Sequence, residues 1–255
     1  MKNKDIEYIV QVENLSKHFG MIEAVSHVSF GVQKGTLFGL AGSDGAGKTT
    51  LLRMIATMIK PTGGKVLVGG HDVVKEKKRA KALIGYMPQR FGLYLDLTVE
   101  ENMDFFMDIF GIFGSERRKR RDLYLGFSNL LPFLDRLAGD LSGGMKQKLG
   151  LACVLVHQPQ VLILDEPTNG VDPVSRQEFW EILMAMQREG MTILVSTAYL
   201  DEGEKCDRLI LMHRSRVLEE ASPAEIQSHF SDLEEAMIHR IQEVDQSIVH
   251  ERFNP

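Results

Sequence analysis

A short stretch between Gly42 and Thr50 carries the clearest chemical signal in the sequence. It fits the phosphate-binding pattern of a glycine, four residues, a second glycine, a lysine and a serine or threonine. Its members are Gly42, Ser43, Asp44, Gly45, Ala46, Gly47, Lys48, Thr49 and Thr50. Glycines let the backbone bend so that its N–H groups approach a polyphosphate. We expect Lys48 to contact the β- and γ-phosphates and the Thr49 hydroxyl to bind Mg²⁺, which prefers oxygen ligands. An ordinary glycine-rich turn with a solvated lysine is the weaker interpretation.

A pair of acids ends a second apolar run. The run at 161–164 has the composition of a buried strand, and Asp165 and Glu166 follow it directly. Carboxylates at the carboxyl end of such a strand are typical of ligand crevices in open α/β sheets. Asp165 is a candidate to hold Mg²⁺ through its water shell, and Glu166 is a candidate base for an attacking water. Helix capping by the two acids is the competing interpretation, which Lys48 and Thr49 disfavour.

Gln89 and Phe19 are weaker candidates. Gln89 follows Pro88 at the end of a predicted strand, where it is either polar surface or a group that ligates Mg²⁺ or orients a water. Phe19 lies just before a turn. Its ring could stack on adenine, although spacing alone favours a place in the core.

The segment Ser142-Gly143-Gly144 precedes an apolar helix. Ser142 is a plausible N-cap, and the two glycines bare backbone N–H groups at the positive end of that helix. The segment is therefore either a second anion-binding site or an ordinary capped helix, and physics alone does not separate the two.

The segments around these residues indicate how they are positioned. The apolar run at 36–41 suits a buried strand, and residues 51–56 have helical spacing. Two alternating runs, at 8–12 and 25–32, suggest an antiparallel β layer. We therefore predict an α/β fold with a mainly parallel sheet, helices on both of its faces, and an added antiparallel β layer.

The pattern changes between about residues 90 and 141, where we predict an inserted helical subdomain. Residues 98–102 have the shape of a helix start. Apolar side chains recur after it at helical spacing: Phe105, Phe106, Ile109 and Phe110. Further on, a serine cap followed by a proline, Ser222 and Pro223, begins a C-terminal helical tail predicted over 222–255.

Composition bounds the classes of function. The chain has 255 residues, 44% hydrophobic and 25% charged, and its net charge of −5 gives no support to a nucleic-acid surface. We interpret its one basic cluster, at 117–121, as a solvated helix face. Cys153 and Cys206 lack metal-ligand spacing and are expected to be buried thiols. Without a signal-peptide core or a run of about eighteen apolar residues, we expect no membrane span.

Taken in order, the phosphate-binding stretch, Gln89 and the segments 141–147, 161–167 and 170–173 resemble the nucleotide-binding subunit of an ATP-binding cassette (ABC) transporter. The resemblance covers about residues 6–240, and it implies a P-loop NTPase core and one nucleotide-binding domain over 1–240. Segments 86–89, 97–102 and 170–173 are similar to ATPases of ABC-2-type exporters, including multidrug and daunorubicin-resistance types. Several short segments resemble the first half of exporters whose two cassettes are fused in tandem.

The resemblance implies cofactors and partners. ATP and Mg²⁺ would be the cofactors, and two cassettes, identical or different, would pair head to tail. Each ATP would lie between one subunit's phosphate loop and the other's Ser142-Gly143-Gly144 segment, with Phe19 stacked on adenine. Gln89 and the helical subdomain would face an ABC-2-type membrane permease subunit. The chain would be a peripheral motor for export at the cytoplasmic face of the cell (inner) membrane.

One residue departs from the family pattern. The family usually has a histidine after the strand at 191–197, in contact with the γ-phosphate, and this sequence has Ala198. A methyl group cannot hydrogen-bond a phosphate, and losing one such preorganised group slows a reaction by about 10²- to 10³-fold. The alternative is therefore a degenerate cassette that binds ATP and supports an active partner. A cassette serving soluble machinery such as ribosomes is less favoured, because those usually carry two cassettes and basic linkers.

Overall fold

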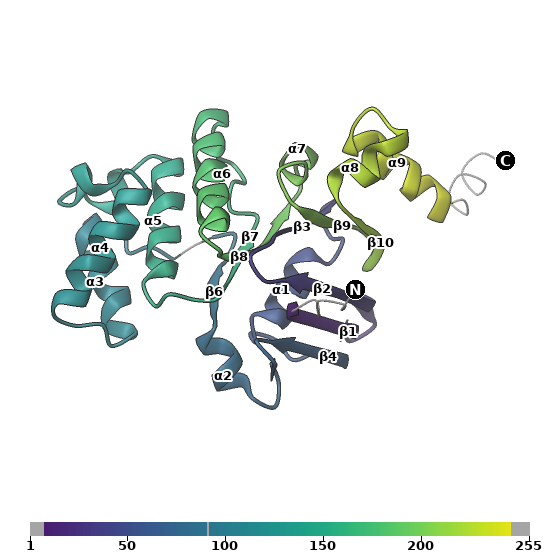
Figure 1. The fold of residues 1–255 in the computed structure, drawn as a ribbon, viewed down its shortest axis with the longest axis horizontal. Helices are drawn as coiled ribbons and strands as arrows, with labels where there is room; N and C mark the ends of the chain where they lie inside the picture. Colours follow the sequence, from purple (N-terminus) through teal and green to yellow (C-terminus); the bar gives the residue numbers. More distant parts are fainter. Residues whose placement is uncertain (1–7, 91, 246–255) are drawn as a thin grey trace, which may run out of the picture.

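A computed structural model describes residues 8–90 and 92–245 of the chain (Figure 1). Residues 1–7 of the predicted domain and residues 246–255 of the predicted tail lie outside the described residues. Within the described ranges, the strands form one six-stranded and one four-stranded sheet, with helices packed on them. The predicted α/β class with a mainly parallel sheet and an antiparallel layer is confirmed.

The six-stranded sheet has the order β10-β9-β3-β8-β7-β6, and its neighbours are parallel except for β9 and β10. The bounds are β3 (Leu37–Gly42), β6 (Ile84–Met87), β7 (Val161–Asp165), β8 (Thr192–Thr197), β9 (Arg208–His213) and β10 (Arg216–Ala221). Asp165 at the end of β7 pairs in register with Ser196 of β8. The carboxyl ends of the parallel strands therefore bring the phosphate-binding stretch and the two acids to one edge.

Both faces of the central strands β3, β7 and β8 are buried, which explains why these strands read as apolar runs. Successive side chains of β7 alternate between faces. Ile163 packs in the cluster with α1 (Lys48–Ile55) and the antiparallel sheet, whereas Leu162 and Leu164 pack with α5 (Gly143–Leu155) and α6 (Pro173–Arg188). The sheet is thus clamped between two layers that fix the position of its carboxyl ends.

The four-stranded sheet has the order β2-β1-β4-β5 and is antiparallel. Its strands are β1 (Tyr8–Phe19), β2 (Ile22–Gln33), β4 (Gly63–Val68) and β5 (His71–Asp72). The first two are longer than the predicted runs, because register shifts let β1 continue along β2 as far as Phe19. A short helix, α2 (Lys77–Ala82), follows β5 and leads into β6.

The helical segment forms its own hydrophobic cluster, at the left of Figure 1. It contains α3 (Val99–Ile109), α4 (Ser115–Phe127) and two 3₁₀ turns, η1 (Leu131–Phe133) and η2 (Ala138–Asp140), and it shares its core with α5. The predicted start of α3 is a capping box between Thr98 and Glu101. The predicted apolar stripe of α3 is wrong at Ile109 and Phe110, which are exposed. The buried face carries Val99, Met103 and Met107, and the predicted Phe106 packs partly buried against the same cluster.

The basic cluster at 117–121 is more than the predicted solvated face. Arg117 donates to both Asp104 and Asp108 of α3, and Arg121 pairs with Glu100. Arg120 donates to the carbonyl of Val156 after α5 at 2.7 Å. The arginines therefore fasten α4 to its neighbours, since acids on α3 supply partners that the basic run alone does not reveal.

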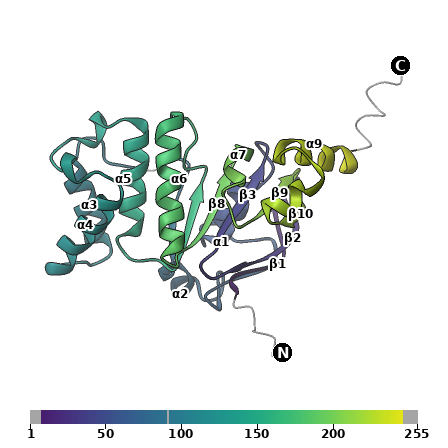
Figure 2. The ribbon, with the colours of Figure 1, turned by 45° about the horizontal axis from the view of Figure 1, so that its top comes forward.

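The C-terminal part packs over the opposite end of the six-stranded sheet from α3 and α4 (Figure 2). It contains α7 (Leu200–Gly203), α8 (Pro223–Ile226), η3 (Gln227–His229) and α9 (Leu233–Val244). The serine start at 222 is a capping box with Glu225. Among the residues described, none of the helices combines the length and the apolar character needed to cross a membrane.

Candidate functional site

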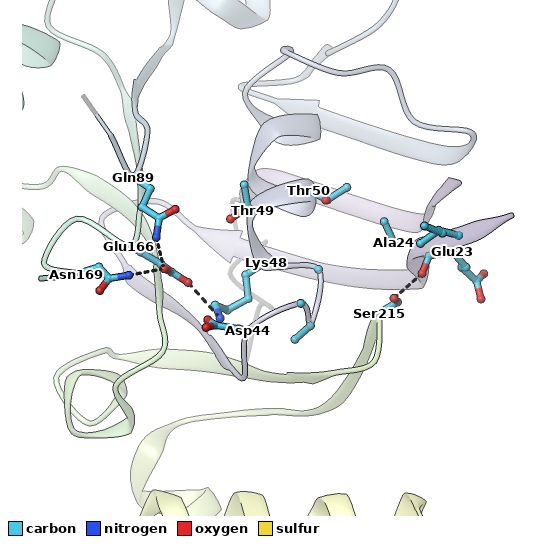
Figure 3. A pocket seen from close by; sticks show the side chains of 14 residues that line it. Glu23, Ala24, Asp44, Lys48, Thr49, Thr50, Gln89, Glu166, Asn169 and Ser215 are labelled. Carbon is cyan, nitrogen blue, oxygen red and sulfur yellow. Dashed lines mark hydrogen bonds and ion pairs between the residues drawn. The ribbon is translucent and has the colours of Figure 1, made fainter. Parts of the chain in front are cut away.

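A cavity of about 490 Å³ lies at the carboxyl ends of β3, β6 and β7 (Figure 3). It falls within the range of about 300–1,000 Å³ that small-molecule sites occupy. Residues from five separate parts of the chain line it: Ile22, Glu23, Ala24, Asp44, Gly45, Ala46, Gly47, Lys48, Thr49, Thr50, Gln89, Glu166, Asn169 and Ser215.

The phosphate loop, residues 42–47, forms one wall of the cavity. Gly47 closes the loop at φ 102°, and a Cβ there would meet the Ala24 carbonyl oxygen at 2.4 Å, so glycine is required on both counts. No side chain caps the first turn of α1, which leaves its backbone N–H groups available to an anion. Lys48 is buried beside them, and its Nζ donates to the carbonyls of Gly42 at 2.6 Å and Ser43 at 3.1 Å.

Thr49 and Asp165 form the second feature of the site. The Thr49 hydroxyl donates to Asp165 Oδ1 at 2.8 Å, and the Ser196 hydroxyl donates to the same oxygen at 3.0 Å. Tyr86 donates its phenol to Asp165 Oδ2 at 3.2 Å. Burial raises the pKa of Tyr86 to about 12, so this phenol keeps its proton at neutral pH. Asp165 is thus oriented on both oxygens.

The donor set at Thr49 and Asp165 fits Mg²⁺. A hydroxyl and a carboxylate that already touch are hard oxygen ligands, which this ion prefers alongside phosphate oxygens and waters. Gln89 turns its amide nitrogen to Glu166 and its amide oxygen away from that residue (Figure 3). Its oxygen is therefore left for a further polar partner in the cavity.

Glu166 is held by three partners from three segments. Its Oε2 accepts from Gln89 Nε2 at 2.9 Å and from Asn169 Nδ2 at 3.2 Å, and its Oε1 lies 3.3 Å from Lys48 Nζ (Figure 3). The backbone of Glu166 has φ 47°, a left-handed conformation that is unfavourable for a non-glycine residue and recurs at functional sites. Its N–H donates to Ser196 Oγ at 3.0 Å, which fixes this turn. The carboxylate is therefore aimed into the cavity.

The structure brings together most of the residues that the sequence predicted for the site. Lys48, Thr49, Gln89, Asp165 and Glu166 meet at the cavity or directly behind it. This arrangement can bind a polyphosphate with a hard cation and place a carboxylate beside a water.

Three predicted features lie outside the cavity lining. Ser142 caps α5 by accepting from the Met145 N–H, but it is exposed, as is Gly143, while Gly144 packs against Ser175 of α6. Phe19 is 49% exposed beneath Lys17, so the core position that spacing favoured is wrong. Ala198 is exposed after β8 and lines a different cavity.

Sequence reasoning missed several residues of the site. The sequence pattern gives Tyr86, Asn169 and Ser196 no role of their own, although Asn169 lies three residues after Glu166 in a tight turn and Ser196 is the second-last residue of the buried strand β8. Both positions are near the carboxyl ends of parallel strands, where open α/β sheets place their ligand crevices. Ser215 carried no such signal, because it reaches the cavity only through the pairing of β9 with β3.

Comparison with known sequences finds a family match and close relatives. The family model "ABC transporter" matches residues 25–169. The probable multidrug ABC transporter ATP-binding protein YbhF of Escherichia coli (strain K12) is 48% identical over 217 residues, which are 84% of this chain and 38% of that protein. The Nod factor export ATP-binding protein I of Ralstonia nicotianae is 38% identical over 222 residues, 87% of this chain and 69% of the relative. The chain thus spans well under half the length of YbhF.

Solved structures give the same relationship. An ATP-binding subunit of an ABC transporter superposes with a TM-score of 0.80 at 27% identity, covering 91% of this chain and 99% of the other. A dimeric ATP-binding cassette in a post-hydrolysis state, bound to ADP and Pi, superposes with a TM-score of 0.74 at 26% identity, covering 84% and 98%.

Proposed function

This chain belongs to the ABC transporter family, and from that premise we propose that it is the ATP-hydrolysing motor subunit of a multidrug-type exporter. The observation that carries the proposal is the placement of the Glu166 carboxylate, which is held by Gln89 and Asn169 and lies 3.3 Å from the phosphate-loop lysine. A carboxylate so placed is within reach of the water that attacks a bound triphosphate.

The ion pair between Lys48 and Glu166 would link nucleotide binding to catalysis, because binding would separate the two side chains. A bound triphosphate offers Lys48 a more highly charged partner than the Glu166 carboxylate. As Lys48 turns to the phosphates, Glu166 Oε1 is released to accept a proton, while Gln89 and Asn169 still hold Oε2. Thr49 and Asp165, with Gln89, would hold Mg²⁺, which neutralises charge on the phosphate oxygens when bound.

The Ser142-Gly143-Gly144 segment supports assembly as a dimer. Its exposed helix start offers N–H groups to an anion but does not line the cavity of its own chain. A second cassette would bring that segment over the nucleotide, with Phe19 against the adenine. The membrane partner would be an ABC-2-type permease subunit, and the site of action the cytoplasmic face of the inner membrane. The similarity to a probable multidrug ABC transporter ATP-binding protein and to a Nod factor export ATP-binding protein supports this proposal.

The test of the hydrolytic role is Glu166→Gln. Glutamine keeps the size of the side chain but cannot take a proton, so Mg²⁺-dependent ATP turnover should fall by about 10²- to 10⁴-fold. Binding of MgATP, measured by calorimetry, should be kept within a few-fold. Glu178→Gln serves as the control, because Glu178 of α6 pairs with Lys148 of α5 and neither residue lines the cavity. Turnover that survives in Glu166→Gln at the wild-type rate would exclude Glu166 as the base.

A second candidate function rests on Ala198. Its methyl group offers no hydrogen bond to a phosphate. If the reaction requires a polar group there, the chain binds ATP but hydrolyses it slowly. The chain would then act as a degenerate cassette that holds a dimer closed while a partner hydrolyses.

Ala198→His separates the two candidates. Ala198 is exposed, so a larger side chain fits without displacing the core. If the missing contact limits the rate, turnover should rise several-fold in the histidine variant and stay unchanged in Ala198→Leu, which adds bulk but no hydrogen bond. Equal turnover in the histidine variant and the wild type would remove the argument for a degenerate cassette.

A further inference from the structure

The turn between β9 and β10 lies against the phosphate loop and has no part in the chemistry described above. Its two residues, Arg214 and Ser215, both have left-handed backbones, with φ 43° and φ 70°. Two-residue hairpin turns of this kind favour glycine, asparagine or aspartate. Because neither residue is of a favoured type, contacts outside the turn must hold its conformation.

Ser215 uses all its polar groups to join the turn to the walls of the cavity. Its N–H donates to the carbonyl of Ala46 in the phosphate loop at 3.1 Å, and its carbonyl accepts from the Ser26 N–H at 2.8 Å. Its hydroxyl donates to the Glu23 carbonyl at 2.6 Å (Figure 3). The turn is therefore hydrogen-bonded to the phosphate loop through Ala46 and to β2 through Glu23 and Ser26.

Asp245, just beyond α9, holds the other side of this turn. One carboxylate oxygen accepts from His213 Nε2 at 2.9 Å, and the other accepts from Arg214 Nη1 at 2.8 Å. The Asp245 side chain is only 14% exposed and that of His213 only 15%. A single carboxylate thus clamps two consecutive residues at the start of the turn with charge-assisted hydrogen bonds.

The position of Asp245 is unfavourable for α9 itself. It is the C-cap residue, where the helix dipole favours cations over carboxylates. The helix has other anchors: Leu233, Ala236 and Met237 pack on β9, and Arg240 donates to Glu219 of β10 at 2.8 Å. The carboxylate therefore serves the turn more than the helix.

We propose that Asp245 is a positioning residue through which α9 sets the nucleotide affinity of the phosphate loop. The contacts run from Asp245 to the turn, and from the Ser215 N–H to the Ala46 carbonyl. A loop held in its binding conformation loses less entropy when it binds a polyphosphate, which raises affinity. This inference rests on the proposed function only in that the cavity takes ATP.

The test compares Asp245→Asn with Glu219→Gln in the full 255-residue chain. Both changes neutralise one acid that fastens α9, but only Asp245 contacts the turn. Calorimetric titration with MgATP should show affinity about threefold to tenfold weaker in Asp245→Asn, the range that loss of one or two hydrogen bonds implies. Glu219→Gln should stay within twofold of wild type.

Hydrogen exchange measured without nucleotide separates a local effect on the phosphate loop from a general loss of stability. Peptides covering 43–47 and 214–216 should exchange faster in Asp245→Asn than in Glu219→Gln. Arg214→Gln, at a side chain 60% exposed, should shift both measurements in the same direction to a smaller extent even if Asp245→Asn folds poorly.

The outcomes separate the inference from the proposed function. A wild-type chain that binds no MgATP would overturn the function. Normal binding in the wild type, with Asp245→Asn equal to Glu219→Gln in affinity, would overturn only the role of Asp245. Unchanged exchange at 43–47 would also overturn it, since the effect would then not pass through the phosphate loop.

Discussion

Two helices of this chain start in a way that suits an anion, and they differ in how much of a site surrounds them. α1 starts at Gly47 with no side-chain cap, inside a cavity and beside the buried Lys48. α5 starts after Ser142, whose hydroxyl already accepts from the Met145 N–H, and Ser142 and Gly143 are exposed. The first start is one wall of an enclosed site, and the second is an open surface.

A lysine in the first turn of each helix shows the same difference in surroundings. Lys48 is 3% exposed and lies 3.3 Å from Glu166, so its charge is confined to the cavity. Lys146, in the first turn of α5, donates to the Gly139 carbonyl at 2.9 Å and faces solvent. Helix N–H groups are thus common to both places, but at α1 the carboxyl end of β7 adds two acids, Asp165 and Glu166, next to the buried Lys48. A helix start becomes a nucleotide site through what the sheet places opposite it.

The largest effect that tests this contrast is expected from Lys48→Ala. Hydrogen bonds to charged groups contribute about 1.5–3 kcal/mol each, so MgATP affinity should fall by about 10- to 100-fold in a calorimetric titration. The variant also leaves Glu166 without its cation, and the melting temperature of the nucleotide-free chain should fall as well.

Lys146→Ala is the matched control at the other helix start. It removes a lysine of the same kind from the first turn of α5, and binding of MgATP to the single chain should stay within twofold of wild type. Equal losses of affinity in the two variants would show that the two helix starts are not different in kind.

Much of this contrast could be predicted from the sequence. The phosphate-binding stretch and the acids after 161–164 depend on local residue order, and the parallel strands then had to bring their carboxyl ends together. The antiparallel layer and the cap at Thr98 were equally local signals. Where chemistry is encoded in neighbouring residues, the sequence was enough.

The remaining features depend on partners far along the chain. Periodicity placed Ile109 and Phe110 on the buried stripe of α3, whereas packing against α5 selected Met103 and Met107. Likewise, Tyr86 and Ser196 orient Asp165 only because β6, β7 and β8 are neighbours in the sheet. The order of the strands in the sheet depends on long-range pairing, which the local sequence pattern does not predict.

A smaller effect is expected from Ser142→Ala, which sharpens the contrast from the side of α5. Loss of the cap should lower the free energy of unfolding by about 0.5–2 kcal/mol, measured by denaturant titration. MgATP binding to the dilute chain should be unchanged. ATP turnover at high chain concentration should fall, because the open start would serve a neighbouring copy.

Ser222→Ala is the control for this change. Ser222 caps α8 by the same side-chain contact, to the Glu225 N–H, and lies in the C-terminal part of the chain. Ser222→Ala should lower the free energy of unfolding by a similar amount without lowering ATP turnover. If both serine variants lowered turnover equally, the effect of Ser142 would be one of stability alone.

The smallest effect is expected from Tyr86→Phe, which removes one hydrogen bond behind the enclosed site. Loss of the contact to Asp165 should weaken MgATP binding by no more than about tenfold, because the phenol acts on the nucleotide only through Asp165, whose other oxygen is still held by Thr49 and Ser196. The pKa of Tyr86 is about 12 in the folded chain, against an ordinary value of 10.0. The unfolded chain therefore releases this proton first, and stability is full below pH 10 and declines as pH rises toward 12.

Tyr86→Phe should remove that part of the alkaline decline, followed as melting temperature against pH. Tyr124→Phe is the control, because burial also raises the pKa of Tyr124, which packs in the helical segment away from the nucleotide cavity. Both variants should flatten the alkaline decline, but only Tyr86→Phe should weaken MgATP binding. If Tyr124→Phe also weakened MgATP binding, the orientation of Asp165 would depend on the packing of the whole core. The hydrogen bonds from Tyr86, Thr49 and Ser196 would then contribute less to the site than their geometry indicates.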